Sequence, residues 1–411
     1  MKELGINALE AKDFLSTVTT KQKDCALQAI ADGLRENSAQ IIEENEKDLK
    51  RGKVNGLPEA LLDRLMLNED RIEGIAKGVE DVKALPDPCG RVLEEVIRPN
   101  GLKIQKVSVP IGVIGIIYEA RPNVTADAAV LCLKSGNAVI LRGGKEAICS
   151  NTAIANIMRE AVESVGFNKN VIQLVSDTTR ESATKLMQMN EYLDCLIPRG
   201  GKGLIKSVVE NSTVPVIETG SGNCHVYVDK SADTDMAADI IFNAKTQRIG
   251  VCNACESLVI HKDVIAEVLP KIKAKLDTKN VEIRGDERAM AVCDGLVPAT
   301  EEDWGTEYLD YIISVKTVDS VDEAIKHINK YSTKHSEAII TNDEENAKAF
   351  MARVDSSSVY VNASTRFTDG GEFGLGAEIG ISTQKLHARG PMGLRELTTT
   401  KYLIFGTGQI R

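Results

Sequence analysis

The feature that most constrains the fold is a regular alternation of short apolar runs and helical segments between residues 109 and 218. Apolar runs of this length predict buried strands, and strands that alternate with helices form a doubly wound parallel sheet. The predicted strands are 113–118, 138–141, 171–175, 195–197 and 214–218, and the predicted helices are 126–134, 148–164 and 181–189. In such a sheet we expect ligands at the carboxyl ends of the strands.

A second α/β stretch begins near residue 226 and continues to about 380. Its predicted helices are 235–247, 263–277, 321–331 and 344–353, and its predicted strands are 257–261, 311–315, 337–341 and 358–362. Residues 7–83 have helical spacing, 91–109 alternates around Asn100-Gly101 as a hairpin does, and 398–405 predicts a strand. We therefore expect a first domain over 1–225 interrupted by the hairpin at 91–109, a second over 226–385, and a returning segment over 386–411.

Composition narrows the function classes. The 411 residues carry a net charge of −10, which disfavours binding to nucleic acid or to anionic membranes. The longest apolar stretch, 107–118, is too short to span a membrane. Residues 1–13 have no apolar core, so we expect no export signal, a cytoplasmic location, and reduced thiols for the nine cysteines.

Two predicted strands open into glycine-rich basic turns. Glycines allow a phosphate to approach the backbone, and the helix that follows presents its positive end to an anion. Two such turns in one sheet suit a ligand with more than one phosphate, although neither matches a known nucleotide fingerprint. Ordinary turns with exposed basic residues are the alternative. The turns contain Arg142, Gly143, Gly144 and Lys145, then Arg199, Gly200, Gly201 and Lys202.

Among the cysteines, Cys252 is the best candidate nucleophile. It follows a predicted helix and a glycine-containing turn, with Arg248 nearby to favour the thiolate. The plain alternative is a small buried apolar residue. Cys252 and Cys255 also form a C-x-x-C pair, for which a redox dithiol or half of a zinc site is the alternative. No second ligand pair completes a zinc site, and we expect no metal.

Polar residues around three arginines complete the candidate set. Arg121 ends the first buried strand, Arg248 precedes Cys252, and Arg366 lies in a polar run at 362–371. Arginine binds carboxylates and phosphates through two parallel hydrogen bonds, so these residues are candidates for holding an anionic substrate. Surface salt bridges are the alternative for each.

Several long segments resemble one family. They are VPIGVIGIIYEARPNVT at 109–125, ETGSGNCH at 218–225, KTQR at 245–248 with Cys252 and Asn253, and GLGAEIG at 374–380. In this order they resemble the gamma-glutamyl phosphate reductases of the aldehyde dehydrogenase superfamily. The resemblance implies an aldehyde dehydrogenase-like α/β fold with two doubly wound domains, a β oligomerisation arm and an N-terminal helical region. The hairpin and the tail are similar to that arm, so we expect a homo-oligomer.

The resemblance also implies roles by position. Cys252 matches the nucleophile and Asn123 the amide that stabilises the oxyanion. Arg142 and Lys145 match positions that contact the cofactor ribose, and the cation at Lys145 favours NADPH. The turn at 198–203 matches the pyrophosphate loop, Glu307 matches a carboxylate that holds the nicotinamide ribose, and Asn253 is placed with the substrate-binding arginines.

The implied reaction reduces L-glutamyl 5-phosphate with NADPH to glutamate 5-semialdehyde and phosphate through a cysteine thioester. It implies a functional link to a glutamate 5-kinase, which would supply the acyl phosphate. Glu218 resembles the general base of hydrolytic aldehyde dehydrogenases, which this reaction does not need, so it is kept as a substrate-site residue. The alternatives are a hydrolytic NAD(P)-dependent semialdehyde dehydrogenase, an acyl-CoA reductase, and a non-catalytic nucleotide-binding redox sensor.

Overall fold

The computed structural model describes residues 1–59 and 61–411, and the chain divides into two compact units. Unit 1 contains Met1–Thr219, Gly374–Gly380 and Met392–Arg411, and unit 2 contains Gly220–Phe373 and Ile381–Pro391. The predicted domain boundary at 225 lies inside the first strand of the second sheet, because the chain enters that sheet at Cys224.

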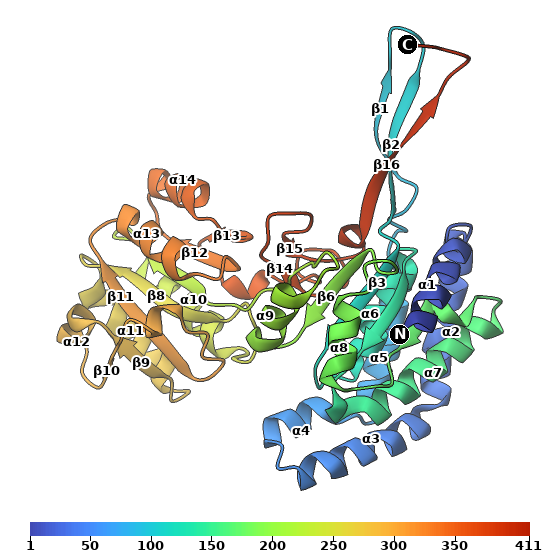
Figure 1. Cartoon of the computed structure of the whole chain (residues 1–411). Helices are drawn as coiled ribbons and strands as arrows, with labels where there is room; N and C mark the ends of the chain where they lie inside the picture. The colour runs from blue at the N-terminus through green and yellow to red at the C-terminus, as the bar shows by residue number, and fades with distance from the viewer. The chain divides into compact units, whose positions relative to one another are not determined.

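Unit 1 is built on a four-stranded parallel sheet in the order β5-β4-β3-β6. Figure 1 labels two of its strands, β3 and β6. The central strand β3 has the sequence VIGIIY and is buried along its whole length, as expected of a parallel strand covered on both faces. The strands are β3 Val113–Tyr118, β4 Ala138–Arg142, β5 Ile172–Leu174 and β6 Cys195–Arg199, and the helices between or after them are α6 Asn123–Lys134, α7 Ile148–Ser164, α8 Arg180–Met187 and α9 Lys202–Asn211.

One predicted strand of this sheet is wrong. The run 214–218 forms only a single bridge, between Val216 and Leu196, instead of a strand. Pro215 has no N–H to donate, so the run cannot continue a ladder of hydrogen bonds.

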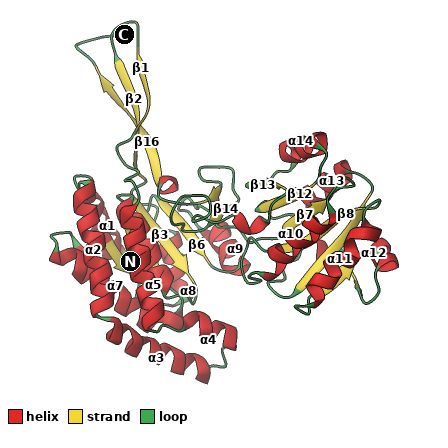
Figure 2. Cartoon of the chain, turned by 180° about the vertical axis from the view of Figure 1, so that it is seen from behind, coloured by secondary structure: helices red, strands yellow, loops and turns green.

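The N-terminal helices pack mainly on α6 and α7, the helices that flank the sheet of unit 1 (Figure 2). α2 packs on α5 and α7, and α5 packs on α6. A capping box between Thr19 and Gln22 starts α2, and the Asn68 side chain caps α5. The helices are α1 Lys2–Leu15, α2 Thr20–Glu36, α3 Ser38–Val54, α4 Glu59–Leu65 and α5 Glu69–Ala84. Among the described residues, no helix is long and apolar enough to cross a membrane.

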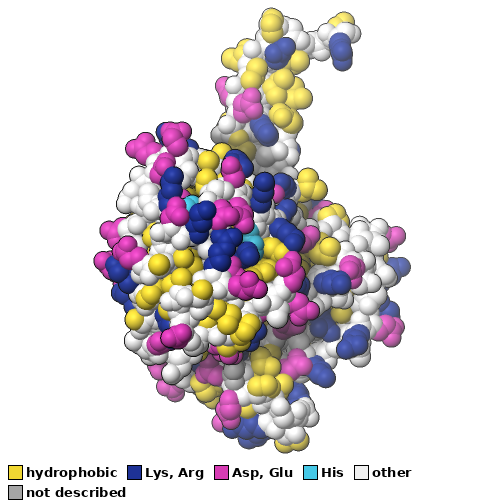
Figure 3. Space-filling model, turned by 90° about the vertical axis from the view of Figure 1, so that its left-hand side faces the viewer, with side chains coloured by type: hydrophobic (Ala, Val, Ile, Leu, Met, Phe, Trp, Pro, Cys, Tyr) yellow, Lys and Arg dark blue, Asp and Glu magenta, His cyan; other side chains and the backbone are white. Residues whose placement is uncertain are grey.

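The predicted hairpin and tail form one three-stranded antiparallel arm, β1-β2-β16 (Figure 1). β1 is Val92–Ile97, β2 is Lys103–Pro110, β16 is Thr398–Phe405, and Gly101 turns the hairpin with a φ of 88°. Apolar side chains lie exposed along it (Figure 3), and they include Val92, Leu93, Val96, Ile97, Tyr402, Ile404 and Phe405.

Unit 2 contains a seven-stranded parallel sheet in the order β10-β9-β11-β8-β7-β12-β13. Its strands are β7 Cys224–Val228, β8 Cys255–His261, β9 Glu282–Gly285, β10 Val297–Pro298, β11 Ile312–Val318, β12 Ser336–Ile340 and β13 Ser358–Val361. Its helices are α10 Thr234–Thr246, α11 Ile265–Asp277, α12 Glu287–Val292, α13 Val321–Tyr331 and α14 Glu344–Arg353, and β14 Ile381–Ser382 pairs with β15 Gly390–Pro391.

A buried ion pair joins α10 to β8. Lys245 Nζ lies 2.6 Å from Glu256 Oε2, and both side chains are completely buried. Lys245 belongs to the last turn of α10 and Glu256 is the second residue of β8. The pair therefore closes the turn at 247–254, which contains Cys252.

We expect Lys245→Met to destabilise the protein by about 3–5 kcal/mol, because it leaves the Glu256 carboxylate buried without its cation. The measurement is the free energy of unfolding in urea. The control is the double variant Lys245→Met/Glu256→Gln, which should recover most of the loss because the buried charge is gone. Equal stability of the single variant and the wild type would contradict this role.

We expect the arm to make the protein an oligomer, because an exposed strand edge with apolar side chains is a pairing surface. Substituting Ile97→Lys together with Ile404→Lys should shift the species seen by light scattering at micromolar concentration toward the monomer. Leu386→Lys is the control, since Leu386 is 83% exposed and lies outside the arm. A monomeric wild type would refute the expectation.

Candidate active site

Cys252 lies in the turn between α10 and β8 and is partly exposed. Gly222 packs directly on its backbone, since a Cβ on Gly222 would lie 1.4 Å from the Cys252 carbonyl oxygen. The amide of Gly222 in turn donates to Glu307 Oε1 over 2.7 Å. The structure thus brings the predicted nucleophile and the predicted Glu307 into one region of unit 2.

A histidine that the sequence did not single out completes this region. His335 Nε2 lies 3.1 Å from Cys252 Sγ, and the His335 side chain is fully buried. Burial lowers the pKa of His335 to about 4, so the imidazole is neutral at pH 7. A neutral imidazole beside a thiol is the arrangement that activates a cysteine nucleophile.

A usable signal for His335 existed in the sequence. Cys252 lies shortly before β8, which begins at Cys255, and His335 directly precedes β12; both strands run parallel to β7 between them. Residues that precede parallel strands of one sheet lie at the same edge of that sheet. The sequence separation of 83 between Cys252 and His335 hides this proximity from any search for a local motif.

The candidate nucleophile therefore lies at the amino edge of the second sheet. Ligands of a doubly wound sheet were expected at the carboxyl edge instead. The polar run at 362–371 spans both edges. Asn362 bonds Thr341 just beyond the carboxyl end of β12, whereas the carbonyls of Arg366 and Thr368 accept from Asn253 beside Cys252. The chain reverses at Asn362, whose φ of 54° makes a sharp turn possible.

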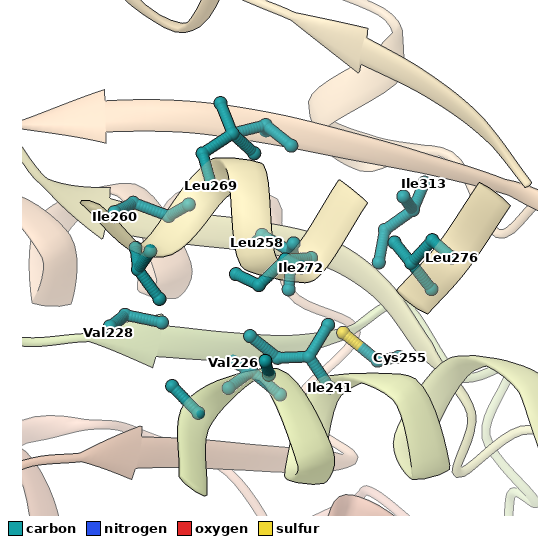
Figure 4. Packing of buried hydrophobic residues seen from close by; sticks show 14 of the residues in the cluster. Val226, Val228, Ile241, Cys255, Leu258, Ile260, Leu269, Ile272, Leu276 and Ile313 are labelled. Carbon is teal, nitrogen blue, oxygen red and sulfur yellow. The ribbon is translucent and has the colours of Figure 1, made fainter. Parts of the chain in front are cut away.

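The remaining cysteines lie in different environments. Cys255 is fully buried in the apolar core between β8, α10 and α11 (Figure 4). Burial raises the pKa of Cys255 and of Cys195 to about 12, and it raises the pKa values of Cys132 and Cys224 as well. A buried thiol of this kind does not ionise at neutral pH, which leaves no basis for reading Cys252 and Cys255 as a dithiol pair.

Two of the three predicted arginines lie near Cys252. Burial lowers the pKa of Arg366, and the positive charge of Arg248 lowers it further, whereas the Cys252 thiolate would raise it. Within the described residues neither guanidinium has a carboxylate at ion-pair distance, and Arg366 Nε donates to Gln247 Oε1 over 2.9 Å. The negative charge of Asp369 raises the pKa of Arg366 but lies beyond ion-pair distance, so the two neighbouring cations suit an anionic ligand.

Asn253, predicted to bind substrate, holds the loop that carries Arg366. Its Nδ2 donates to the carbonyl of Arg366 over 3.2 Å and to that of Thr368 over 3.0 Å. The backbone carbonyl of Asn253 accepts a hydrogen bond from Thr365 Oγ1 over 2.7 Å. The Asn253 side chain thus uses both its amide hydrogens on protein atoms, and a contact with substrate stays a prediction.

The first glycine-rich turn follows β4 in unit 1. Lys145 is exposed, whereas Arg142 Nη2 donates to the carbonyls of Thr178 and Thr179 over 2.7 and 3.0 Å. Gly143 is required sterically, since a Cβ there would lie 2.1 Å from Asn151 Nδ2, and a Cβ on Gly144 would meet Glu146. The carboxylate of Asp48 on α3 accepts from Ser150 N over 2.8 Å and so fixes the start of α7.

The second turn, 199–202, follows β6 and starts α9. Because β3 pairs with both β4 and β6, the two turns lie at the same edge of the sheet, as predicted. Lys202 is exposed, and Arg199 packs against Gly380. The amide of Gly201 donates to Glu119 Oε2 over 2.9 Å, and a Cβ on Gly200 would lie 2.7 Å from the same carboxyl group. Sequence reasoning missed this role of Glu119.

Three predicted residues remain in unit 1. Asn123 is exposed at the start of α6, and its Nδ2 donates to Asp127 Oδ2 over 2.8 Å, which leaves its second amide hydrogen for another acceptor. Burial raises the pKa of Asp127 to about 6. Arg121 is exposed and Glu218 is half-buried, and their roles stay predictions. Among the described residues, no group of three or more histidine, cysteine or acidic side chains is arranged to hold a metal ion.

Comparisons with known proteins identify relatives along the whole chain. The aldehyde dehydrogenase family model matches residues 5–292 and 297–402. The gamma-glutamyl phosphate reductase of Lachnospira eligens is 60% identical over 411 residues, which cover 100% of this chain and 99% of that protein, and the one of Clostridium novyi is 59% identical over 98% and 97%. The crystal structure of gamma-glutamyl phosphate reductase from Thermotoga maritima superposes with a TM-score of 0.98 at 50% identity, over 100% of this chain and 99% of that one.

Proposed function

Because this chain belongs to the aldehyde dehydrogenase family and, within it, to the gamma-glutamyl phosphate reductases, we propose that it reduces L-glutamyl 5-phosphate to glutamate 5-semialdehyde with Cys252 as the nucleophile. The observation that carries the role of Cys252 is its partly exposed thiol, 3.1 Å from a neutral imidazole. The names of the relatives support the substrate, and the geometry around Cys252 supports its role as the nucleophile.

The chemistry follows from the electrophile. A free carboxylate resists attack, whereas an acyl phosphate carries a good leaving group. The Cys252 thiolate adds to the acyl carbon, phosphate departs with the electrons of the C–O bond, and a thioester remains. Asn123 and the backbone amide of Cys252 are the proposed donors to the oxyanion. NADPH, when bound, supplies the hydride that converts the thioester to the aldehyde.

The residues of unit 1 fit a dinucleotide phosphate. Lys145 and Lys202 are exposed cations on two turns at the same sheet edge, and the N-terminus of α9 presents backbone amides. The Glu119 carboxylate holds the Gly201 amide, so a phosphate that binds there must displace it. Arg142 shapes the turn through the carbonyls of Thr178 and Thr179.

The residues of unit 2 fit the nicotinamide end and the substrate. Glu307, which reaches the Gly222 amide beside Cys252, is the proposed contact for the nicotinamide ribose. Arg248 and Arg366 are the proposed contacts for the anionic groups of the substrate. Since an acyl phosphate hydrolyses readily in water, we propose a functional link to the glutamate 5-kinase that supplies it.

We expect the reverse reaction, NADP+ reduction with glutamate 5-semialdehyde followed at 340 nm, to require inorganic phosphate. Phosphate must cleave the thioester to release the acyl phosphate. Cys252→Ser should lower the rate at least 1,000-fold, because an alcohol ionises far less readily than a thiol. The matched control is Cys255→Ser, which should retain turnover because Cys255 lies in the apolar core.

Each other outcome of this assay would support one of the alternative functions. Turnover without phosphate would make the protein a hydrolytic dehydrogenase with Glu218 as its base. Coenzyme A in place of phosphate would make it an acyl-CoA reductase. NADPH binding without turnover on either acceptor would support a redox sensor.

We expect Lys145→Glu to lower the preference for NADPH over NADH roughly 10- to 100-fold, because it removes a charge-assisted hydrogen bond to the 2′-phosphate. The ratio of kcat/KM values for the two nucleotides is the measurement. Lys279→Glu, an exposed charge reversal in unit 2, controls for the change in net charge. An unchanged ratio would show that Lys145 does not read the 2′-phosphate.

A further inference from the structure

The imidazole of His335 lies between the candidate nucleophile and a chain of hydroxyl groups. Nε2 faces Cys252 Sγ at 3.1 Å, and Nδ1 lies 2.8 Å from Ser336 Oγ. Ser336 Oγ is 2.6 Å from Thr368 Oγ1, which is 2.6 Å from the hydroxyl of Tyr360. The three hydroxyl groups come from β12, from the loop after β13 and from β13 itself, so tertiary structure alone assembles the chain.

Each hydroxyl group in this hydroxyl chain can donate or accept a hydrogen bond, so the hydrogen bonds can run in either of two directions, called here the two polarities. In one, Nδ1–H donates to Ser336 and the bonds run outward to Tyr360, which leaves Nε2 as a bare acceptor facing the thiol. In the other, the bonds run inward and Nδ1 accepts from Ser336. Nε2 then carries a proton that it donates to the thiolate. The two polarities differ only in the positions of protons.

A simple imidazole base would be costly here. His335 is fully buried, and an imidazolium ion in its place would lack solvation. The lowered pKa of His335 expresses the same preference for the neutral form. The hydroxyl chain removes this difficulty, because one proton can leave Nδ1 as another arrives at Nε2.

We propose that His335 takes the thiol proton of Cys252 at Nε2 while its Nδ1 proton passes into the hydroxyl chain. Ser336, Thr368 and Tyr360 carry that proton outward, so the thiolate forms without a charged imidazole in the buried site. The assignment rests on the proposed function of Cys252 as nucleophile, and it adds the base that the reaction needs.

The proton and electron balance of acylation is complete. The S–H bond breaks, the S–C bond to the acyl group forms, and the C–O bond to phosphate breaks with its electron pair on phosphate. One proton leaves the far end of the chain at the half-buried Tyr360, and the departing phosphate takes up one proton from water. When the aldehyde is released, the thiolate regains a proton from His335 and the chain reverses its polarity.

The test is the rate at which iodoacetamide alkylates Cys252 at pH 7, followed by mass spectrometry of its peptide. This reaction requires the thiolate but neither acyl phosphate nor nucleotide. We expect His335→Asn to slow it about 100-fold, the lower end of the contribution of a positioned base. The exposed Cys25 in the same molecule is the internal control, and its rate should not change.

The second variant, Thr368→Val, keeps the imidazole and nearly the same volume but breaks the hydroxyl chain. It should slow alkylation of Cys252 several-fold. Both variants should approach the wild-type rate at strongly alkaline pH, because hydroxide then removes the thiol proton without a protein base. The titratable groups that face the imidazole are the Cys252 and Cys224 thiols, and the nearest acidic group along β12, Glu337, is held by His225.

The outcomes separate this proposal from the proposed function. Wild-type alkylation of Cys252 in both variants would overturn the role of His335, whatever the reductase assay gives. If His335→Asn also exposes the buried Cys255 to alkylation, that variant has lost its fold. The alkylation rate of Thr368→Val then tests the proposal. If the wild-type protein lacks reductase activity but alkylation of Cys252 still depends on His335, the proposed function is wrong and the role of His335 as the base stands.

Discussion

The candidate catalytic region of unit 2 depends on the buried ion pair between Lys245 and Glu256. Two completely buried charges 2.6 Å apart are stable only if further hydrogen bonds compensate their lost hydration, and Glu256 Oε1 accepts such a bond from the amide of Leu309. The pair thus joins α10, β8 and the segment at 307–309. From that segment Glu307 reaches the Gly222 amide, and Gly222 packs on the carbonyl of Cys252. One line of contacts that positions Cys252 therefore leads back to this pair.

Environment, more than residue type, distinguishes the nine cysteines. Burial without a base keeps Cys132, Cys195 and Cys255 as neutral thiols with raised pKa values. Cys252 differs because it is partly exposed and has an imidazole at hydrogen-bond distance. The two cations Arg248 and Arg366 favour the thiolate over the neutral thiol. Among the described residues, Cys252 is the cysteine that combines access, a base and positive charge.

Much of the fold follows from local pattern. Strand β3, helices α7, α13 and α14, and the tail strand β16 lie where apolar periodicity predicts them. Local pattern failed where one residue or a weak signal decided the outcome. Pro215 prevents a strand at 214–218, and β9 is a four-residue strand whose side chains alternate too briefly to be recognised. The glycine turns, the candidate nucleophile and the candidate arginines could be predicted because each lies in a contiguous motif.

The sequence by itself determined the fold class and the family to which the chain belongs, and it predicted the nucleophile, because these depend on contiguous residues and their spacing. Only the tertiary structure showed which distant groups lie around Cys252. His335 contacts the thiol, and the hydroxyl groups of Ser336, Thr368 and Tyr360 continue the hydrogen bonds from the other side of its imidazole. Parallel strands bring Cys252 and His335, which precede β8 and β12, to the same edge of the sheet. The structure likewise placed the Glu119 carboxylate on the Gly201 amide. A hydrogen bond depends on distance in space, and spacing along the chain does not encode that distance.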